Sequence, residues 1–423
     1  MNWLLSMFIG DKILAGHFQK LVSWFALSKV ITILCSIVVT RLLDPREFAV
    51  IASVLAVQGT IIAFTAVNFY SQLIRIDFVS KKQLQVAWSY ELLRNVILAC
   101  ILYSLAPLIA RAIERPDTLT VFRVTSVQFL LLGLRNPRLL ELRRDGKFGI
   151  LGLQDSVGPV AYAVSSVVFA CLRPDYWALV GAGLVSFLLS TISSYFCLAW
   201  RPSLDFCWRT VKPLAQFGLV IQLSAIFIAF REHSLVFVLV TMGYPEETGF
   251  LNRATTFSTM LAVQIIGIFW KVSYPRFARL ANRGEHPAAI AARLQLRMVL
   301  IGAPVALIGS GFGVFAIPYV FGAEWKPMGP LWFILVLSSV FLVANSVIDA
   351  AWQATKREVL SLKIQAACMT FQLILSFVFV KTYGFIGLGL AVIGANLLCF
   401  FIMRQLVLSM SEEEKTVLVE SRD

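Results

Sequence analysis

The chain has 423 residues, of which 58% are hydrophobic and 14% are charged, and its mean hydropathy is +0.79. Soluble proteins carry about 45–50% apolar and about 25% charged residues. A chain of this length could not cover a soluble surface with so few charges, so the composition argues against a soluble enzyme, a disordered protein or a disulfide framework. It predicts a polytopic membrane protein.

The hydrophobic runs predict about twelve membrane-spanning helices. A spanning helix needs about 20 mostly apolar residues, because the hydrocarbon core is ~30 Å thick. Continuous rather than alternating apolar runs favour helices over barrel strands. In chain order, the predicted spans are residues 21–40, 48–70, 88–110, 118–134, 149–172, 176–199, 214–241, 249–270, 298–320, 328–352, 364–380 and 384–403.

The net charge of +13 could indicate a nucleic-acid partner, but the basic residues lie in short loops between apolar runs. With both termini on one side of the membrane, that side holds 25 Lys and Arg residues and the other holds 7. Lys and Arg are retained on the cytoplasmic side during membrane insertion. The distribution therefore predicts two cytoplasmic termini and no nucleic-acid partner.

A motif repeats about 200 positions apart and divides the predicted spans into two groups of six. Residues 41–49 (RLLDPREFA) and 241–249 (TMGYPEETG) each join two spans through a proline followed by an acidic residue. Such a link ends one helix and begins the next. We therefore expect a cytoplasmic N-terminal segment (1–20), a six-helix lobe (21–200), a cytoplasmic linker (201–213), a second six-helix lobe (214–403) and a cytoplasmic tail (404–423) that is disordered from Ser411 onward.

Three short motifs resemble one transporter family. Residues 41–48 resemble the first-span signature of polysaccharide flippases, residues 249–254 (GFLNRA) resemble the entry to the eighth span, and residues 275–280 (PRFARL) resemble the motif after that span. The chain is identified as similar to the Wzx-like oligosaccharidyl-lipid flippases of the multidrug/oligosaccharidyl-lipid/polysaccharide exporter superfamily. Asp44, Ala49 and Phe250 depart from the usual motif residues.

The resemblance implies a V-shaped cavity between two lobes that opens to alternate sides of the bacterial cytoplasmic membrane. The implied cargo is an oligosaccharide on a polyprenyl pyrophosphate, moved from the inner to the outer leaflet for surface or exopolysaccharide synthesis. The expected partners are this lipid-linked oligosaccharide and membrane lipids, and a polysaccharide polymerase and other assembly proteins stay open. No Walker A loop or metal-ligand spacing is present in the sequence, so no cofactor is expected. Proton or sodium coupling stays open.

Ionisable residues inside the spans supply the candidate binding residues, because such groups at membrane depth need a partner or a cavity. Lys29 lies near the middle of the first span, and Arg231 lies within the seventh. Either could bind the pyrophosphate; alternatively, Lys29 reaches the interface and Arg231 forms a structural ion pair. Arg253, in the first turn of the eighth span, either contacts the headgroup or pairs with Glu246 or Glu247.

Three further residues are candidates for ion coupling: Glu232, His233 and Asp349. His233 titrates near physiological pH when unperturbed, although a lone histidine more often makes a structural hydrogen bond. Asp349 either receives a cation or lies exposed at the interface. Glu91 and Arg94 are three residues apart and are predicted to form a local ion pair on one helix face.

Two other functions stay open. A multidrug or metabolite antiporter of the same superfamily would favour acidic groups in the spans, whereas this chain has five basic and four acidic ones there. A membrane glycosyltransferase or polysaccharide polymerase would need a large loop outside the membrane, and the sequence leaves no room for one. The predicted function is therefore that of a transporter and not of an enzyme.

Overall fold

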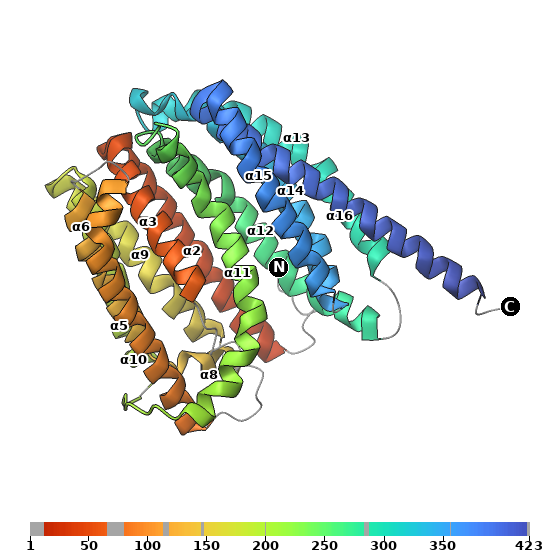
Figure 1. Ribbon diagram of the computed structural model, residues 1–423, viewed down its shortest axis with the longest axis horizontal. Coiled ribbons are helices and arrows are strands. Elements are labelled where there is room, and N and C mark those ends of the chain that lie inside the picture. Colours follow the sequence, from red (N-terminus) through yellow and green to blue (C-terminus); the bar gives the residue numbers. More distant parts are fainter. Residues whose placement is uncertain are drawn as a thin grey trace. The chain divides into compact units, whose positions relative to one another are not determined.

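The computed structural model describes residues 12–65, 80–112, 118–144, 148–198, 200–282, 287–355 and 357–420 (Figure 1). Every regular element in these ranges is a helix. The α-helices are α2 (Lys12–Leu42), α3 (Pro45–Thr65), α5 (Lys81–Ala112), α6 (Thr118–Thr125), α7 (Val127–Gly133), α8 (Leu139–Arg144), α9 (Phe148–Leu172), α10 (Tyr176–Cys197), α11 (Trp208–Thr241), α12 (Thr248–Asn282), α13 (Ala288–Val320), α14 (Met328–Ala354), α15 (Glu358–Tyr383) and α16 (Gly387–Glu420). The short 3₁₀ helices η1 (Ala323–Trp325) and η2 (Gly384–Ile386) precede α14 and α16.

Seven segments of the described residues are long and apolar enough to cross a membrane. They are Pro45–Thr65, Lys81–Ala112, Gly149–Leu172, Tyr176–Cys197, Ala288–Val320, Met328–Ala354 and Val359–Met410, the last of which covers most of α15 and the first part of α16. Each of the twelve predicted spans overlaps one or more described helices, and residues 66–70 of the predicted span 48–70 lie outside the described residues. The all-α membrane fold is therefore as predicted, whereas the count of twelve spans in two six-helix lobes stays a prediction.

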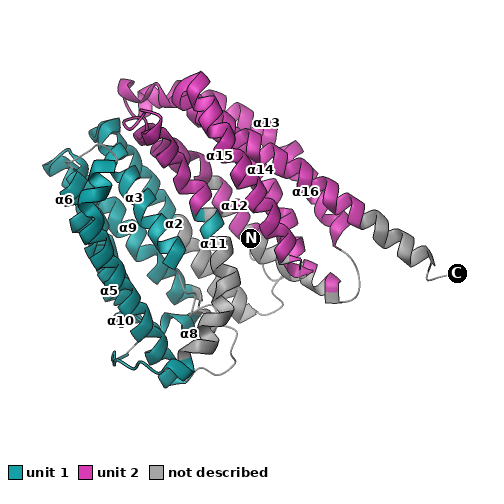
Figure 2. Ribbon diagram, viewed as in Figure 1, with its two compact units in different colours: residues 1–229 teal, residues 230–423 magenta. Residues whose placement is uncertain are grey.

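The chain divides into two compact units, unit 1 (Met1–Ala229) and unit 2 (Phe230–Asp423), shown in Figure 2. The division falls inside α11, which is continuous from Trp208 to Thr241. The predicted lobe boundaries, with a linker at residues 201–213, are not decided by this division.

In unit 1, α9 packs against both α2 and α10, and α5 packs against α6 and α7. A polar contact joins the start of α3 to the start of α10: the Glu47 carboxylate accepts a hydrogen bond of 2.7 Å from the Tyr176 backbone N–H. The Asp175 side chain accepts a second bond of 2.9 Å from the Trp177 N–H. These two acids occupy the positively polarised N-terminus of α10, where negative charge is favourable.

In unit 2, α14 is the central helix and contacts α12, α13, α15 and α16. Its Ile348 and Trp352 are almost completely buried and pack with Cys399 and Met403 of α16. Side chains buried on every face of a helix are typical of a central position. The position of α14 matters because it carries Asp349, one of the predicted coupling residues.

Two predictions about helix continuity are wrong. The predicted span 118–134 is divided into α6 and α7 at Ser126, whose hydroxyl donates to the Arg123 carbonyl at 2.7 Å. A side chain that bonds its own backbone competes with helix hydrogen bonding. The tail was expected to be disordered, but α16 continues to Glu420. Residues 404–420 contain strong helix formers and no Gly or Pro, so local propensity favours the helix despite the acidic run.

The glycine-rich run after α15 makes a tight turn. Gly384 has φ of +63°, a conformation that other residues rarely adopt. A Cβ on Gly387 would lie 2.0 Å from the backbone oxygen of Phe379. This turn therefore requires glycine for close approach.

Candidate functional site

The six predicted site residues are distributed over both units. Lys29 lies on α2 in unit 1. The other five lie in unit 2, on α11 (Arg231, Glu232 and His233), α12 (Arg253) and α14 (Asp349). Binding of one pyrophosphate by Lys29 and Arg231 together stays a prediction.

Lys29 lies close to the midpoint of α2 and its side chain is half-buried. The neighbouring Ser28 is 5% exposed and Val30 is 53% exposed, so Lys29 lies at the edge between the packed and open faces of the helix. The packed face contacts α9, where the Ser156 hydroxyl donates to the Trp24 carbonyl at 3.4 Å. A lysine here is held by a rigid helix pair, which favours a fixed position for its charge.

Asp349 has the most developed polar surroundings of the six residues. The Ser361 hydroxyl of α15 donates to the Asp349 carboxylate at 2.6 Å, and the Gln365 amide donates to Ser361 at 3.1 Å. The Asp349 side chain is half-buried. The Ser361 hydroxyl thus partly covers the carboxylate, while the two interpretations of Asp349, a cation acceptor or an acid at the membrane interface, stay predictions.

Arg231 belongs to the same polar region as Asp349. The Gln372 amide of α15 donates to the Arg231 backbone carbonyl at 3.2 Å. Both predicted residues thus contact α15, Arg231 through its backbone carbonyl and Asp349 through its carboxylate.

The other two predicted residues of α11 have different surroundings. Glu232 is exposed, whereas Arg231 and His233 are half-buried. Adjacent helical residues point about 100° apart, as the sequence-based argument required. The three residues therefore do not form a single cluster on one helix face.

Arg253 makes a contact that the sequence did not indicate. Its guanidinium donates twice to the Asn252 side-chain oxygen, at 2.9 and 3.2 Å. The predicted pairing with Glu246 or Glu247 and the alternative headgroup contact stay predictions.

A second buried polar chain in unit 2 was missed by sequence reasoning. The Gln295 amide donates to Asn345 at 3.4 Å, Asn345 donates to the Asn396 carbonyl at 3.1 Å, and Asn396 donates to the Ser338 hydroxyl at 2.8 Å. All four side chains are at most 5% exposed. Uncharged polar residues inside spans are a weak signal, and these link α13, α14 and α16.

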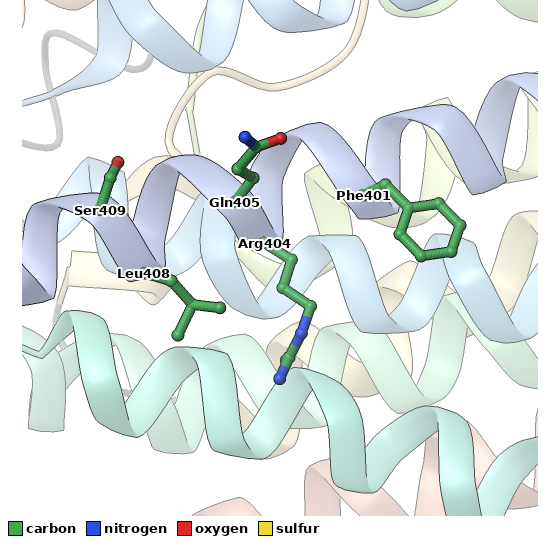
Figure 3. A pocket seen from close by; sticks show the side chains of 5 residues that line it. All are labelled: Phe401, Arg404, Gln405, Leu408 and Ser409. Carbon is green, nitrogen blue, oxygen red and sulfur yellow. The ribbon is translucent and has the colours of Figure 1, made fainter.

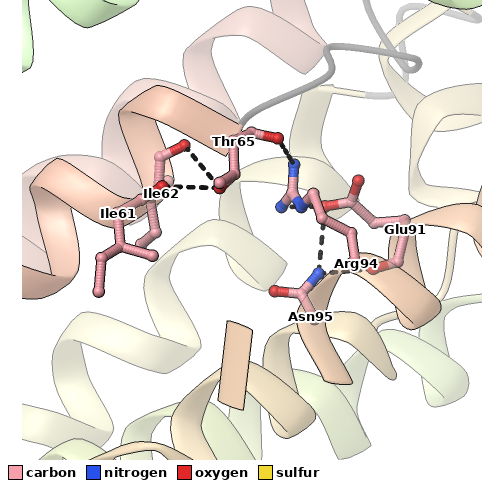
Figure 4. Close-up of polar contacts among 6 residues, drawn as sticks. All are labelled: Ile61, Ile62, Thr65, Glu91, Arg94 and Asn95. Carbon is pink, nitrogen blue, oxygen red and sulfur yellow. Dashed lines mark hydrogen bonds and ion pairs between the residues drawn. The ribbon is translucent and has the colours of Figure 1, made fainter. Parts of the chain in front are cut away.

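The predicted ion pair of Glu91 and Arg94 is confirmed. The Arg94 guanidinium lies 2.6 Å from the Glu91 carboxylate, and the two side chains are 17% and 15% exposed. Figure 4 shows Arg94 directed toward the Thr65 carbonyl, at 3.5 Å, where α3 ends. The pair therefore fastens the end of α3 to α5, and Asn95 adds a bond to Glu91 at 3.3 Å.

The other charged residues within spans also have partners. Asp155 pairs with Arg135 at 3.5 Å, and the Arg123 guanidinium lies 5.0 Å from the centre of the Tyr103 ring. Within the described residues, no group of three His, Cys, Asp or Glu side chains is arranged to hold a metal ion.

A shallow cavity of about 430 Å³ lies along one face of α16 (Figure 3). Its lining residues are Phe401, Arg404, Gln405, Leu408 and Ser409. Arg404 also donates to the Ala292 carbonyl of α13 at 2.9 Å. None of the six predicted site residues lines this cavity, so it is separate from the polar region around Asp349.

Residues 38–330 match the family described as "Polysaccharide biosynthesis protein", and the chain belongs to this family. This confirms the predicted resemblance to polysaccharide flippases, which rested on motifs within the same range.

Two curated relatives agree with this family. The chain is 22% identical over 299 residues to "Teichuronic acid biosynthesis protein TuaB" of Bacillus subtilis, covering 65% of this chain and 58% of the relative. It is also 22% identical over 287 residues to "Putative O-antigen transporter" of Shigella flexneri, covering 66% of this chain and 67% of the relative. The alignment thus spans less than two thirds of the first relative's length.

Two solved structures share the fold over most of the chain. An inward-facing multidrug resistance transporter of the MATE family superposes with a TM-score of 0.74 at 18% identity, covering 91% of this chain and 95% of the other. The lipid II flippase MurJ superposes with a TM-score of 0.73 at 13% identity, covering 92% and 87%. The protein is therefore a multi-pass, all-α membrane protein with a transporter fold.

Proposed function

We propose that this protein moves a polyprenyl-pyrophosphate-linked oligosaccharide from the inner to the outer leaflet of the bacterial cytoplasmic membrane, by alternating access. The family match over residues 38–330 carries the proposal. The relative named as an O-antigen transporter and the shared fold with a lipid II flippase support it. On this proposal the protein is a transporter and not an enzyme.

The cationic residues Lys29, Arg231 and Arg253 are the proposed contacts for the pyrophosphate. A pyrophosphate crossing the bilayer needs cationic partners, because its charge would otherwise face hydrocarbon. The half-buried position of Lys29 at the middle of α2 supports its role. Arg231 is the proposed second contact, and the Gln372 amide of α15 holds its backbone carbonyl at 3.2 Å.

Asp349 is the proposed ion-coupling residue with the strongest support, ahead of Glu232 and His233. Ser361 and Gln365 place polar atoms near its carboxylate, and Arg231 of α11 contacts the same helix, α15. A phosphate bound to Arg231 would neutralise the positive charge of that residue. The Asp349 carboxylate would then take up a proton or a sodium ion more readily. Transport would in this way be coupled to an ion gradient.

The test is a flipping assay in vesicles that contain only this protein and a fluorescent lipid-linked sugar, together with surface polysaccharide measured in cells. We expect Lys29→Ala to abolish flipping and Lys29→Arg to retain part of it, since charge matters more than shape for a hydrated headgroup. The matched control is Lys381→Ala, which removes an exposed lysine at the end of α15. Normal flipping by Lys29→Ala would contradict the role of Lys29.

The coupling proposal is tested separately. Asp349→Asn should abolish the response of flipping to an imposed proton or sodium gradient while the protein still accumulates in the membrane. An unchanged response to both gradients would contradict the role of Asp349.

Two outcomes would replace the proposed function. Export of cationic drugs with no flipping of the lipid-linked sugar would favour the multidrug antiporter, and sugar transfer by the protein alone would favour a glycosyltransferase. The proposed cytoplasmic location of the C-terminus is tested by fusion proteins. Green fluorescent protein fused there should fluoresce, and alkaline phosphatase fused there should be inactive.

A further inference from the structure

An extended segment between α10 and α11 is docked on the first part of α5. We call residues 200–209 the docked segment. Trp200 packs edge-on against Trp88 with ring centres 5.2 Å apart, and Phe206 packs edge-on against Tyr90 at 5.5 Å. Between these contacts, the Asp205 backbone N–H donates to the Ser89 hydroxyl at 2.8 Å. The segment therefore has a fixed position on unit 1, although it is not helical before Trp208.

The docked segment exposes a row of large apolar side chains. Leu204 is 64% exposed, Phe206 is 51% exposed and Trp208 is 62% exposed. Along residues 204–208 these exposed side chains alternate with the half-buried Asp205 and Cys207, which indicates one open edge. The intervening Asp205 is half-buried and the preceding Ser203 is exposed and polar. One edge of the segment is thus apolar, and an edge of this kind is unfavourable in water.

The contacts with α5 place the docked segment where the membrane surface is expected. α5 has 32 residues and is therefore about 48 Å long, which exceeds the ~30 Å hydrocarbon core. Its exposed Lys81 and Lys82 mark one end, and its exposed apolar side chains run from Leu93 to Leu108. Trp88 and Tyr90 lie between these two regions.

The docked segment also carries basic residues, which are common in protein segments at a membrane surface. Arg201 and Arg209 are exposed at its two ends, with the apolar row between them. Aromatic residues are enriched at the level of lipid headgroups, and exposed basic residues attract anionic lipids.

We propose that the docked segment is a membrane-surface anchor that inserts Leu204, Phe206 and Trp208 among the headgroups of an anionic phospholipid leaflet, with Arg201 and Arg209 bound to lipid phosphates. The anchor keeps the end of α10 and the beginning of α5 at a constant depth during transport. This inference depends on the membrane location of the protein and not on its cargo.

The experiment uses a cysteine-free variant of the full chain with a polarity-sensitive thiol fluorophore at either Leu204→Cys or Ser203→Cys. Each protein is reconstituted in vesicles of phosphatidylcholine alone or mixed with phosphatidylglycerol. We expect the probe at 204 to be quenched by spin-labelled lipid and protected from aqueous iodide, and the adjacent probe at 203 to show the reverse. The lipid quenching at 204 should increase with phosphatidylglycerol and lose that increase in Arg201→Gln/Arg209→Gln.

Three results would overturn the proposal. Equal iodide quenching at 203 and 204 would mean that the apolar row faces water. Protection at 204 without lipid quenching would mean that protein covers it. Lipid quenching that does not respond to phosphatidylglycerol would remove the anionic preference.

A measurement on the unaltered chain guards against effects of the substitutions. A phospholipid with a photoreactive group near its headgroup should crosslink to peptides containing residues 200–209 in native membranes. Failure to crosslink there, with crosslinking to other interfacial peptides of the same protein, would also contradict the anchor.

Discussion

Replacement of Glu91 by leucine should be one of the most destabilising single changes in unit 1. Glu91→Leu replaces the carboxylate by an apolar side chain of similar size. It removes the negative charge opposite Arg94, which lies 2.6 Å away in the native protein. Arg94 then keeps only the Thr65 carbonyl, at 3.5 Å, as a described partner for its guanidinium. A single weak bond to a carbonyl does not compensate a buried cation.

The size of the effect follows from burial. The two side chains are only 15% and 17% exposed, so the ion pair is largely shielded from water. Removing one partner of such a pair costs about 3–5 kcal/mol, whereas replacing both partners by apolar residues is often close to neutral. We therefore expect Glu91→Leu/Arg94→Met to recover most of the stability lost in Glu91→Leu, apart from about 1 kcal/mol for the lost bond to Thr65.

The measurement is the free energy of unfolding of the purified protein in mixed micelles, arranged as a double-mutant cycle. The control is Arg173→Gln, because the Arg173 side chain is 70% exposed and its pair with Asp175 should contribute at most about 1 kcal/mol. A double variant as unstable as Glu91→Leu, or a Glu91→Leu as stable as the control, would refute the reasoning.

Three further predictions concern other parts of the chain. Gly387→Ala should reduce thermal stability strongly because its Cβ would lie 2.0 Å from a backbone oxygen, whereas Gly309→Ala, with open space around it, should have little effect. Glu47→Gln should lower the unfolding free energy by about 1–2 kcal/mol, since a charge at the N-terminus of α10 is lost, and an unchanged value would argue against this contact. A hydrogen bond from Thr210 lowers the pKa of the Cys207 thiol below its usual range. The rate of Cys207 alkylation should therefore fall off at a lower pH than that of an ordinary thiol, and Thr210→Val should shift the profile to higher pH.

The sequence by itself determined the class of fold and the family. A continuous apolar run of about 20 residues has few alternatives to a membrane-spanning helix, because backbone polar groups must be paired inside lipid. Each predicted span therefore overlaps one or more helices of the described residues. Contacts between residues close in sequence could also be predicted. Glu91 and Arg94 are three residues apart, and helical geometry alone brings them together.

Helix boundaries and breaks were less predictable. Hydropathy marks the part of a helix that lies in lipid, but it does not register the ends that extend beyond it. α12 accordingly continues to Asn282 and α16 to Glu420, well past the predicted spans. The break at Ser126 depends on one hydroxyl turning back to its own backbone, which hydropathy does not record.

Only the tertiary structure decided which polar residues meet. Glu47 contacts the Tyr176 backbone across 129 positions of sequence, and Asp349 contacts Ser361 on the following helix. The relative rotation and register of two packed helices set such contacts, and these depend on the fit of many side chains along both surfaces. A hydropathy pattern gives the face that a helix buries but not which polar residue on a neighbouring helix lies opposite. The surroundings of Asp349 therefore had to come from the packed core of unit 2.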